Sequence, residues 1–232
     1  MPEISHRLQQ VCSEISLYEQ EFDRPAGSVQ LLAVSKTRPY TDLLQAWENG
    51  QTCFAENYIQ EALEKINKLR SLPIQWHFIG PIQSNKTRAI AENFDWVHSI
   101  DRLKIAQRLN DQRPPDKPPL QVLIQVNSSE ENSKSGCRFA ELKPLALAIS
   151  TLPRLQLRGL MTLPAACDDF EQQRKPLRKL RLALRELNQS DFRLDTLSMG
   201  MSNDMRAAIA EGATIVRIGT ALFGERKTTA VD

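Results

Sequence analysis

Cysteine is scarce in this 232-residue sequence, which contains only four residues of this type. They are Cys12, Cys53, Cys137 and Cys167. No two of them form a C-x-x-C pair, so the sequence predicts neither a zinc site nor a small scaffold held together by disulfide bonds. We therefore predict no metal-ligating residues, and we expect the protein to work in a reducing compartment, the cytoplasm.

An excess of one charge and long hydrophobic runs are also absent. Thirty basic residues stand against twenty-eight acidic ones, a formal net charge of +2. This balance favours neither nucleic acid nor a membrane surface as a partner. No stretch approaches the ~20 apolar residues that a membrane helix needs, and residues 1–16 lack the apolar core of a signal peptide. We expect a soluble protein with neither kind of partner.

Glycine-rich phosphate loops and the common catalytic sets are missing as well. Residues 35–42, "SKTRPYTD", contain no glycine, whereas a doubly wound nucleotide-binding sheet carries a G-x-G-x-x-G turn after an early strand. No P-loop and no Ser/His/Asp or Cys/His set can be proposed. His77 and His98 are interpreted as packed or rim histidines, because no pattern of carboxylates and cysteines surrounds them.

What the sequence does have is a regular alternation of short apolar runs with helical patterns. The apolar runs cover residues 31–35, 52–57, 76–80, 95–100, 121–127, 155–161, 196–200 and 214–219. Strands that alternate with helices are parallel, because a crossover helix returns the chain to the same edge of the sheet. Eight such units predict the α/β class and a single TIM-type (β/α)8 barrel, with residues 1–232 as one domain.

An extra helix precedes the first strand. Residues 3–22 place apolar side chains at helical spacing with charged residues between them. After the eighth strand only residues 224–232, "GERKTTAVD", remain, and they are too short and polar for a final helix. We predict that the N-terminal helix packs beside the first strand and takes that place. The loop at 127–137, after the fifth strand, is interpreted as a lid.

The candidate site follows from the predicted fold, because loops after the strands form the active face of such barrels. The carboxyl ends of the first, second, seventh and eighth strands carry the candidate ligand-binding residues Lys36, Asn57, Ser198, Met199, Ser202, Arg217, Gly219 and Thr220. Phosphate is often held after strands seven and eight together with a helix N-terminus. Ser202 is predicted to cap the helix after strand seven, and Gly219 lets the backbone approach a ligand closely.

Lys36 has two interpretations. A lysine after a strand is most often solvated. A Schiff-base lysine must instead react as a neutral amine, so its pKa has to fall from ~10.4 towards ~7 to 8 through burial and nearby positive charge. Arg217 would supply such a charge, since no acidic residue lies within three positions of it. A phosphate site at the last two strands favours the reactive amine.

The helical pattern between the sixth and seventh strands carries a row of arginines opposite a row of leucines. The arginines are Arg174, Arg178, Arg181 and Arg185. A solvated outer face explains this row better than an RNA-binding surface does.

Five motifs together resemble one known family. They are "AVSKTRP", "FAENYIQEALEK", "WHFIGPIQSNK", "LMTLPA" and "LSMGMSNDMRAAIAEGATIVRIGTALFG", in order over nearly the whole chain. The sequence closely resembles the YggS/PROSC family of pyridoxal phosphate (PLP) homeostasis proteins. The resemblance implies PLP fold type III, the barrel of the alanine racemase N-terminal domain, and a Schiff base between PLP and Lys36.

The same resemblance implies roles for the other candidate residues. It places Arg217 against the pyridine nitrogen of PLP and Asn57 and Met199 in the cofactor wall. It also places four residues around the phosphate, namely Ser198, Ser202, Gly219 and Thr220. A cationic arginine disfavours a protonated pyridine ring, so PLP becomes a poorer electron sink and transaminase chemistry is disfavoured.

Three functions remain open at this point. The first is a PLP-binding protein that serves vitamin B6 and amino-acid homeostasis without turnover, with apo forms of PLP enzymes as candidate recipients. The second is a PLP-dependent racemase or lyase, although we expect this chain to lack the second domain from which alanine racemases supply an acid/base tyrosine. The third is an aldolase-like barrel whose lysine binds a sugar phosphate. Without the second domain, through which racemases dimerise, we expect a monomer.

Overall fold

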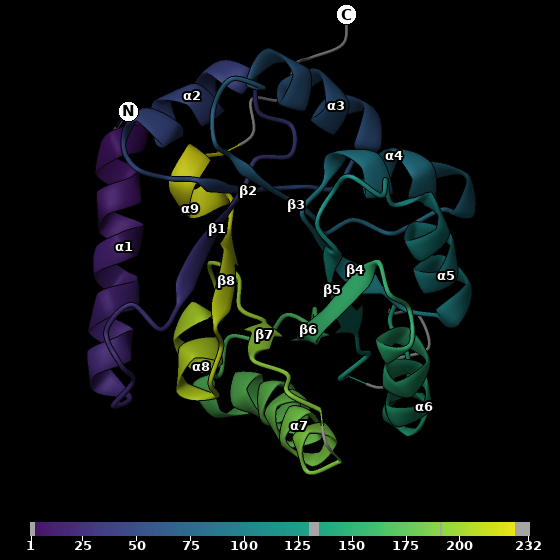
Figure 1. Ribbon diagram of the computed structural model, residues 1–232. Helices are drawn as coiled ribbons and strands as arrows, with labels where there is room; N and C mark the ends of the chain where they lie inside the picture. The colour runs from purple at the N-terminus through teal and green to yellow at the C-terminus, as the bar shows by residue number, and fades with distance from the viewer. Residues whose placement is uncertain (1–2, 130–134, 191, 226–232) are drawn as a thin grey trace, which may run out of the picture.

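Eight parallel strands form a closed barrel in this protein (Figure 1). The computed structural model describes residues 3–129, 135–190 and 192–225. The strands pair in chain order, and the last pairs with the first. They are β1 (Gln30–Val34), β2 (Cys53–Glu56), β3 (Gln75–Phe78), β4 (Trp96–Ile100), β5 (Leu120–Gln125), β6 (Leu155–Met161), β7 (Thr196–Ser198) and β8 (Ile215–Ile218). The predicted (β/α)8 barrel is confirmed.

A ring of helices surrounds the barrel (Figure 1). They are α1 (Ile4–Glu21), α2 (Tyr40–Glu48), α3 (Ile59–Lys68), α4 (Thr87–Asn93), α5 (Leu103–Gln112), α6 (Phe139–Ser150), α7 (Phe170–Asn188), α8 (Met205–Ala210) and α9 (Thr220–Phe223), with a 3-10 turn η1 (Ser84–Lys86) before α4. Each helix from α2 onward follows a strand, and its apolar side packs on the outside of the sheet. The loops that lead from strand to helix all open at one mouth of the barrel.

The N-terminal helix α1 occupies the position predicted for it. It contacts α2, α8 and α9, and Figure 1 shows it alongside β1. Its buried residues Leu8, Val11 and Ile15 belong to the main hydrophobic core. The helix α9 has only four residues and ends at Gly224, which has a positive φ of 81°. A helix that short leaves the flank of β8 and β1 uncovered, so α1 is needed to bury it.

The interior of the barrel is less uniformly apolar than the main hydrophobic core outside it. The main core lies between the strands and the helices, whereas two small apolar clusters are separate from it. One contains Leu32, Cys53, Ala55 and Ile215, and the other contains Trp96, Leu123 and Met161. His98 on β4 bonds Ser198 on β7, and this hydrogen bond joins strands that are not neighbours. The bond therefore crosses the barrel interior, which is partly polar.

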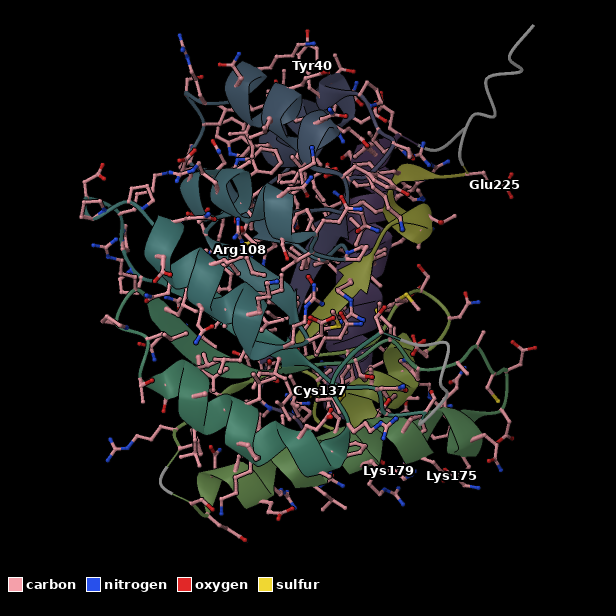
Figure 2. All side chains as sticks on the ribbon, turned by 90° about the vertical axis from the view of Figure 1, so that its right-hand side faces the viewer. Tyr40, Arg108, Cys137, Lys175, Lys179 and Glu225 are labelled. Atoms are coloured by element: carbon pink, nitrogen blue, oxygen red, sulfur yellow. The ribbon has the colours of Figure 1, made fainter. Side chains whose placement is uncertain are left out.

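The arginine row on α7 has a partner that the sequence pattern did not indicate. Arg174, Arg178 and Arg181 each bond the carboxylate of Glu211, which follows α8 and is fully buried. Arg185 is exposed, and Figure 2 shows Lys175 and Lys179 of the same helix at the outer edge of the molecule. The predicted solvated face is thus correct for Arg185, whereas Arg174, Arg178 and Arg181 form ion pairs that hold α7 against Glu211.

Two further expectations concern loops and membranes. Residues 130–134 of the predicted lid lie outside the described residues. In the part of the chain that the structure describes, none of the helices combines the length and apolarity that a bilayer crossing requires.

Candidate functional site

A cavity of about 470 Å³ lies at the carboxyl ends of the strands. Six of the eight predicted site residues line it, namely Lys36, Asn57, Ser202, Arg217, Gly219 and Thr220. They come from the ends of β1, β2, β7 and β8, which are far apart in sequence. Closure of the barrel brings these ends together, because parallel strands all point their carboxyl ends to one mouth.

Ser198 and Met199 lie behind the cavity wall instead of in it. Both are fully buried, and Met199 belongs to the main hydrophobic core. The Ser198 hydroxyl lies 2.9 Å from Nδ1 of His98 and accepts a 2.8 Å hydrogen bond from Nη1 of Arg217. The Ser198 side chain is therefore linked to the cavity wall through Arg217.

The turn that carries Lys36 is held by hydrogen bonds on both sides. Lys65 on α3 donates from Nζ to the carbonyl oxygen of Ser35 at 2.7 Å. The amide of Thr37 donates to Oε1 of Glu61 at 2.5 Å. Thr37 has a positive φ of 64°, a conformation that a β-branched residue adopts only when its surroundings hold it there. These contacts fix the backbone on either side of Lys36.

Lys65 also belongs to an ion cluster, which we call the Lys65 cluster and which consists of Lys65, Glu56 and Glu61. Lys65 and Glu56 are buried, and the Glu61 side chain is 28% exposed. Nζ of Lys65 lies 2.7 Å from Oε1 of Glu56 and 2.6 Å from Oε1 of Glu61. The Ser35 hydroxyl donates to the same Glu56 oxygen at 2.6 Å. Burial raises the pKa of Glu56 against the attraction of Lys65, and its Oε2 has no hydrogen-bond partner among the described residues.

Arg217 supplies a buried positive charge in the cavity wall. Its side chain is 3 % exposed, and it donates to Oγ of Ser198 and to the carbonyl oxygen of Thr162, both at 2.8 Å. Burial lowers the pKa of Arg217 to about 10, while the charge of Asp204 opposes that shift. The guanidinium is thus still a cation at neutral pH. Both of these acceptors are neutral, so the charge can act on a bound anion or lone pair.

The turn after β7 depends on a glycine. Gly200 has a φ of 96°, and a Cβ at this position would lie 2.6 Å from the Cβ of Ala208. The turn then places Met201, Ser202 and Asn203 at the cavity. The predicted helix cap is wrong, because α8 begins two residues later with Asp204 as its N-cap residue. Ser202 lies in the preceding turn, where it lines the cavity instead.

The sequence reasoning missed the wall contributed by β6. Residues 163–168 and Gln173 line the cavity, and Gln173 donates to the carbonyl oxygens of Cys167 and Asn203 at 2.6 and 3.1 Å. This side chain joins the loop after β6 to the turn after β7. The strand-end rule could have found the loop, because "LMTLPA" ends the sixth apolar run in the same way as "AVSKTRP" ends the first.

The acid and base groups in the cavity wall include Lys36, Cys167, Asp168 and Asp204. Among the residues that the structure describes, no tyrosine lines the cavity. Tyr18 lies in α1, Tyr40 begins α2, and Tyr58 precedes α3 with 59 % of its side chain exposed. Over the same residues, no group of three His, Cys, Asp or Glu side chains is placed to hold a metal ion.

Known proteins resemble this chain over nearly its full length. The family model "Alanine racemase, N-terminal domain" matches residues 15–227. The pyridoxal phosphate homeostasis proteins of Vibrio alginolyticus and Escherichia coli K12 are 55% and 52% identical to it, over 97% of this chain and 99% and 98% of theirs. PipY of Synechococcus elongatus, solved with PLP bound, has a TM-score of 0.84 at 36% identity, over 95% of this chain and 100% of PipY.

Alanine racemases share the fold more distantly. The enzyme of Corynebacterium glutamicum has a TM-score of 0.70 at 18% identity, over 99% of this chain but 63% of the enzyme. Identity at this level shows the barrel alone. The family match and the curated relatives lead to one conclusion: this chain belongs to the alanine racemase N-terminal domain family and, within it, to the pyridoxal phosphate homeostasis proteins.

Proposed function

We propose that this protein binds pyridoxal 5'-phosphate reversibly through a Schiff base with Lys36, and that residues 1–232 form one cofactor-binding domain. Its role is in vitamin B6 and amino-acid homeostasis, and the names of its curated relatives, pyridoxal phosphate homeostasis proteins, support the first part of this role. One observation carries the proposal. The cavity brings the Lys36 side chain together with a buried arginine and with the turns after β7 and β8.

The residues present fit this cofactor. The cavity of about 470 Å³ is within the range usual for small-molecule sites, roughly 300–1,000 Å³. When bound, PLP supplies an aldehyde that captures amines and a ring that withdraws electrons. Lys36 would hold the aldehyde carbon and Arg217 would face the pyridine nitrogen. Ser202, Gly219 and Thr220 would bind the phosphate, and Asn57 would contact the ring.

Absence of turnover is the second part of the proposal. Arg217 keeps its proton and donates it as a hydrogen bond, so it disfavours protonation of a ring nitrogen placed against it. A protonated ring is what makes PLP a strong electron sink. The lack of a tyrosine among the described cavity residues supports the same view, because the family resemblance assigns the second acid/base group of a racemase to a tyrosine. Cys167, Asp168 and Asp204 also line the cavity, and the exchange experiment below tests whether any of them acts in its place.

The first experiment is the visible spectrum of the protein reconstituted with PLP. Wild-type protein should be yellow, and borohydride should remove its visible band. Lys36→Ala should lack the band, whereas Lys104→Ala, which changes an exposed lysine on α5, should keep it. A band of unchanged position and intensity in Lys36→Ala would place the linkage on another lysine. A colourless wild type that binds a sugar phosphate instead would favour the aldolase-like alternative.

The second experiment separates a binding protein from the alternative, a PLP-dependent racemase or lyase. Holo-protein is incubated with single enantiomers of small amino acids in deuterated buffer, and exchange of the α-proton is followed by NMR. We expect exchange no faster than with free PLP. Rapid exchange, or formation of the other enantiomer, would show that the protein is an enzyme.

We also propose that the protein acts as a monomer in the cytoplasm and delivers PLP to apo forms of PLP enzymes. Light scattering on a size-exclusion column should give the mass of one chain. Mixing holo-protein with an apo-transaminase should restore its activity faster than the same concentration of free PLP does. Equal rates would argue for release into solution before capture.

A further inference from the structure

A continuous row of hydrogen bonds runs through the barrel interior from Arg217 to Gln75, and we call it the histidine network. Nη1 of Arg217 lies 2.8 Å from Oγ of Ser198, which lies 2.9 Å from Nδ1 of His98. Nε2 of His98 lies 2.9 Å from Nδ1 of His77, and Nε2 of His77 lies 3.0 Å from Oε1 of Gln75. Four strands contribute to it, namely β8, β7, β4 and β3.

The network is isolated from water at its centre. His77, His98 and Ser198 are fully buried, and Gln75 is half-buried at the amino end of β3. The indole ring of Trp96 stacks on the His77 ring with centroids 5.4 Å apart and an angle of 7° between the planes. Packing of this kind holds the ring plane, so His77 presents its two nitrogens to His98 and Gln75 in a fixed direction.

Arg217 gives the network its direction, because a guanidinium only donates. The Ser198 oxygen accepts from it, which leaves the hydroxyl hydrogen to donate to Nδ1 of His98. The hydrogen of His98 is then on Nε2 and donates to Nδ1 of His77. The hydrogen of His77 is likewise on Nε2 and donates to Gln75. The reverse direction would leave the Ser198 hydroxyl hydrogen without an acceptor among the contacts of the described residues.

Burial keeps the two rings neutral. It lowers the pKa of His77 to about 3, and it lowers that of His98 well below 6.5 with added repulsion from His77 and Arg217. A second proton on His77 would also place two N–H groups against each other between the histidines, and a second proton on His98 would face the hydroxyl hydrogen of Ser198. The network therefore gives Arg217 an acceptor while adding no charge that would neutralise the guanidinium.

We propose that His77 and His98 are positioning residues for Arg217. Acting through Ser198, they fix one guanidinium nitrogen, so that the cation keeps one orientation towards the cavity and keeps its full charge. A carboxylate in their place would orient the arginine but cancel that charge. The inference deepens the proposed function, since the group that Arg217 faces there is the PLP ring.

The first test needs no cofactor. Two-dimensional 15N NMR of the apo-protein at neutral pH reports which imidazole nitrogen carries the hydrogen. The sequence has three histidines, and His6 is exposed on α1, so it serves as the solvent reference. We expect both His77 and His98 to be neutral with the hydrogen on Nε2. A hydrogen on Nδ1 of either ring, or a doubly protonated ring, would overturn the proposal even if PLP binds as expected.

The second test compares two substitutions at one position by PLP affinity and by the visible band. His98→Asn places an amide oxygen near the former Nδ1 and can still accept from Ser198, whereas His98→Leu cannot. We expect His98→Leu to bind PLP about tenfold more weakly with a shifted band, the loss expected for one hydrogen bond in a charged network, and His98→Asn to stay close to wild type. Thermal unfolding of both variants first establishes that they fold.

Either of two results would contradict the positioning role of His77 and His98. One is wild-type affinity and an unshifted band in His98→Leu, and the other is an equal loss in both variants. If His98→Leu does not fold, the NMR experiment decides. If the wild type itself does not bind PLP, the proposed function fails while the NMR result still judges the positioning role.

Discussion

Two glutamates with fully buried side chains lie in opposite electrostatic surroundings in this barrel. Glu211 bonds Arg174 and Arg178 at 2.8 Å and Arg181 at 3.0 Å. Hydrogen bonds and attraction from these arginines lower the pKa of Glu211 although burial opposes the shift. Glu56 forms an ion pair with Lys65, and burial raises its pKa against that attraction. The negative charge of a buried glutamate is therefore well compensated at Glu211 and poorly compensated at Glu56.

The difference follows from where the cations come from. The three arginines reach Glu211 from the surface of α7, with 25 to 45% of their side chains exposed, so they keep part of their hydration. Lys65 is nearly as buried as Glu56, and it also serves Glu61 and the carbonyl of Ser35. One cation divided among three acceptors compensates each of them less.

Glu211, which does not line the cavity, thus stabilises the packing of α7 on α8, whereas the Lys65 cluster holds the turn around Lys36. We infer that incomplete compensation at Glu56 accompanies the rigid, strained turn that carries Lys36. Four predictions test or sharpen this contrast, in order of decreasing effect.

The largest effect is expected for Glu211→Ala. The substitution leaves three arginines facing one another at a buried point, and removing one partner of a buried pair costs about 3 kcal/mol or more. We expect a loss of about 3 kcal/mol in the free energy of unfolding, measured with urea at neutral pH, with PLP affinity unchanged. Glu186→Ala, at an exposed position on α7, is the control. A loss below about 1 kcal/mol would contradict the assigned role.

Lys65→Met should cost less stability but affect the cofactor. Glu56 can take up a proton when the cation is gone, so we expect a loss of about 2 kcal/mol, from the broken hydrogen bonds to Ser35 and Glu61. The turn around Lys36 loses its support, and PLP should dissociate several times faster in a stopped-flow experiment. Lys104→Met controls for loss of a lysine. An unchanged dissociation rate would mean that the cluster does not position Lys36.

The two carboxylates should also give opposite pH dependences. Because the folded pKa of Glu211 is lowered, its stabilisation is present above the unfolded pKa of ~4.3 and is lost as pH falls through the folded value. Because the folded pKa of Glu56 is raised, its contribution is present below ~4.3 and is lost as pH rises through the folded value.

Urea unfolding of Glu211→Gln and Glu56→Gln, from about pH 4 to pH 7, checks both signs. The stability difference between wild type and Glu211→Gln should shrink towards acid pH. For Glu56→Gln the trend should be the opposite: the stability of the wild type relative to this variant should increase towards acid pH. Parallel curves for the two variants would show that the two sites are not electrostatically distinct.

The smallest effect concerns Thr37, whose φ of 64° is strained for a residue with a Cβ. Thr37→Gly should raise the free energy of unfolding by about 0.5 kcal/mol, since the relief of strain slightly exceeds the extra entropy of an unfolded glycine. Thr37→Ala keeps the Cβ and should bring no gain. Equal stabilities for the two variants would locate the strain elsewhere in the turn.

Much of the candidate site was predictable because it rests on periodicity. The apolar runs mark the strands, their ends mark the mouth, and Lys36, Asn57 and Arg217 then meet in one cavity. The pairing of His77 with His98 was not predictable, although both were recognised as packed. It depends on which face of β3 and β4 turns inward and on the register between them, and a slip of one residue would separate the rings.

Long-range polar contacts were the other gap. The family resemblance placed Ser198 at the phosphate, and the structure shows that its hydroxyl bonds a histidine 100 positions away. Glu56 gave a weak signal, a charged residue inside the otherwise apolar run "TCFAEN". That signal does not indicate Lys65 as the partner of Glu56, because the two side chains meet only when α3 packs on the barrel.

The sequence by itself determined the elements and their order, since local periodicity and the alternation of strand and helix are properties of neighbouring residues. It also determined which side chains stand at the mouth. Only the tertiary structure decided which of them line the cavity and which are buried next to its wall. That choice depends on barrel closure and on burial, which set the distances and the effective dielectric between groups far apart in the chain.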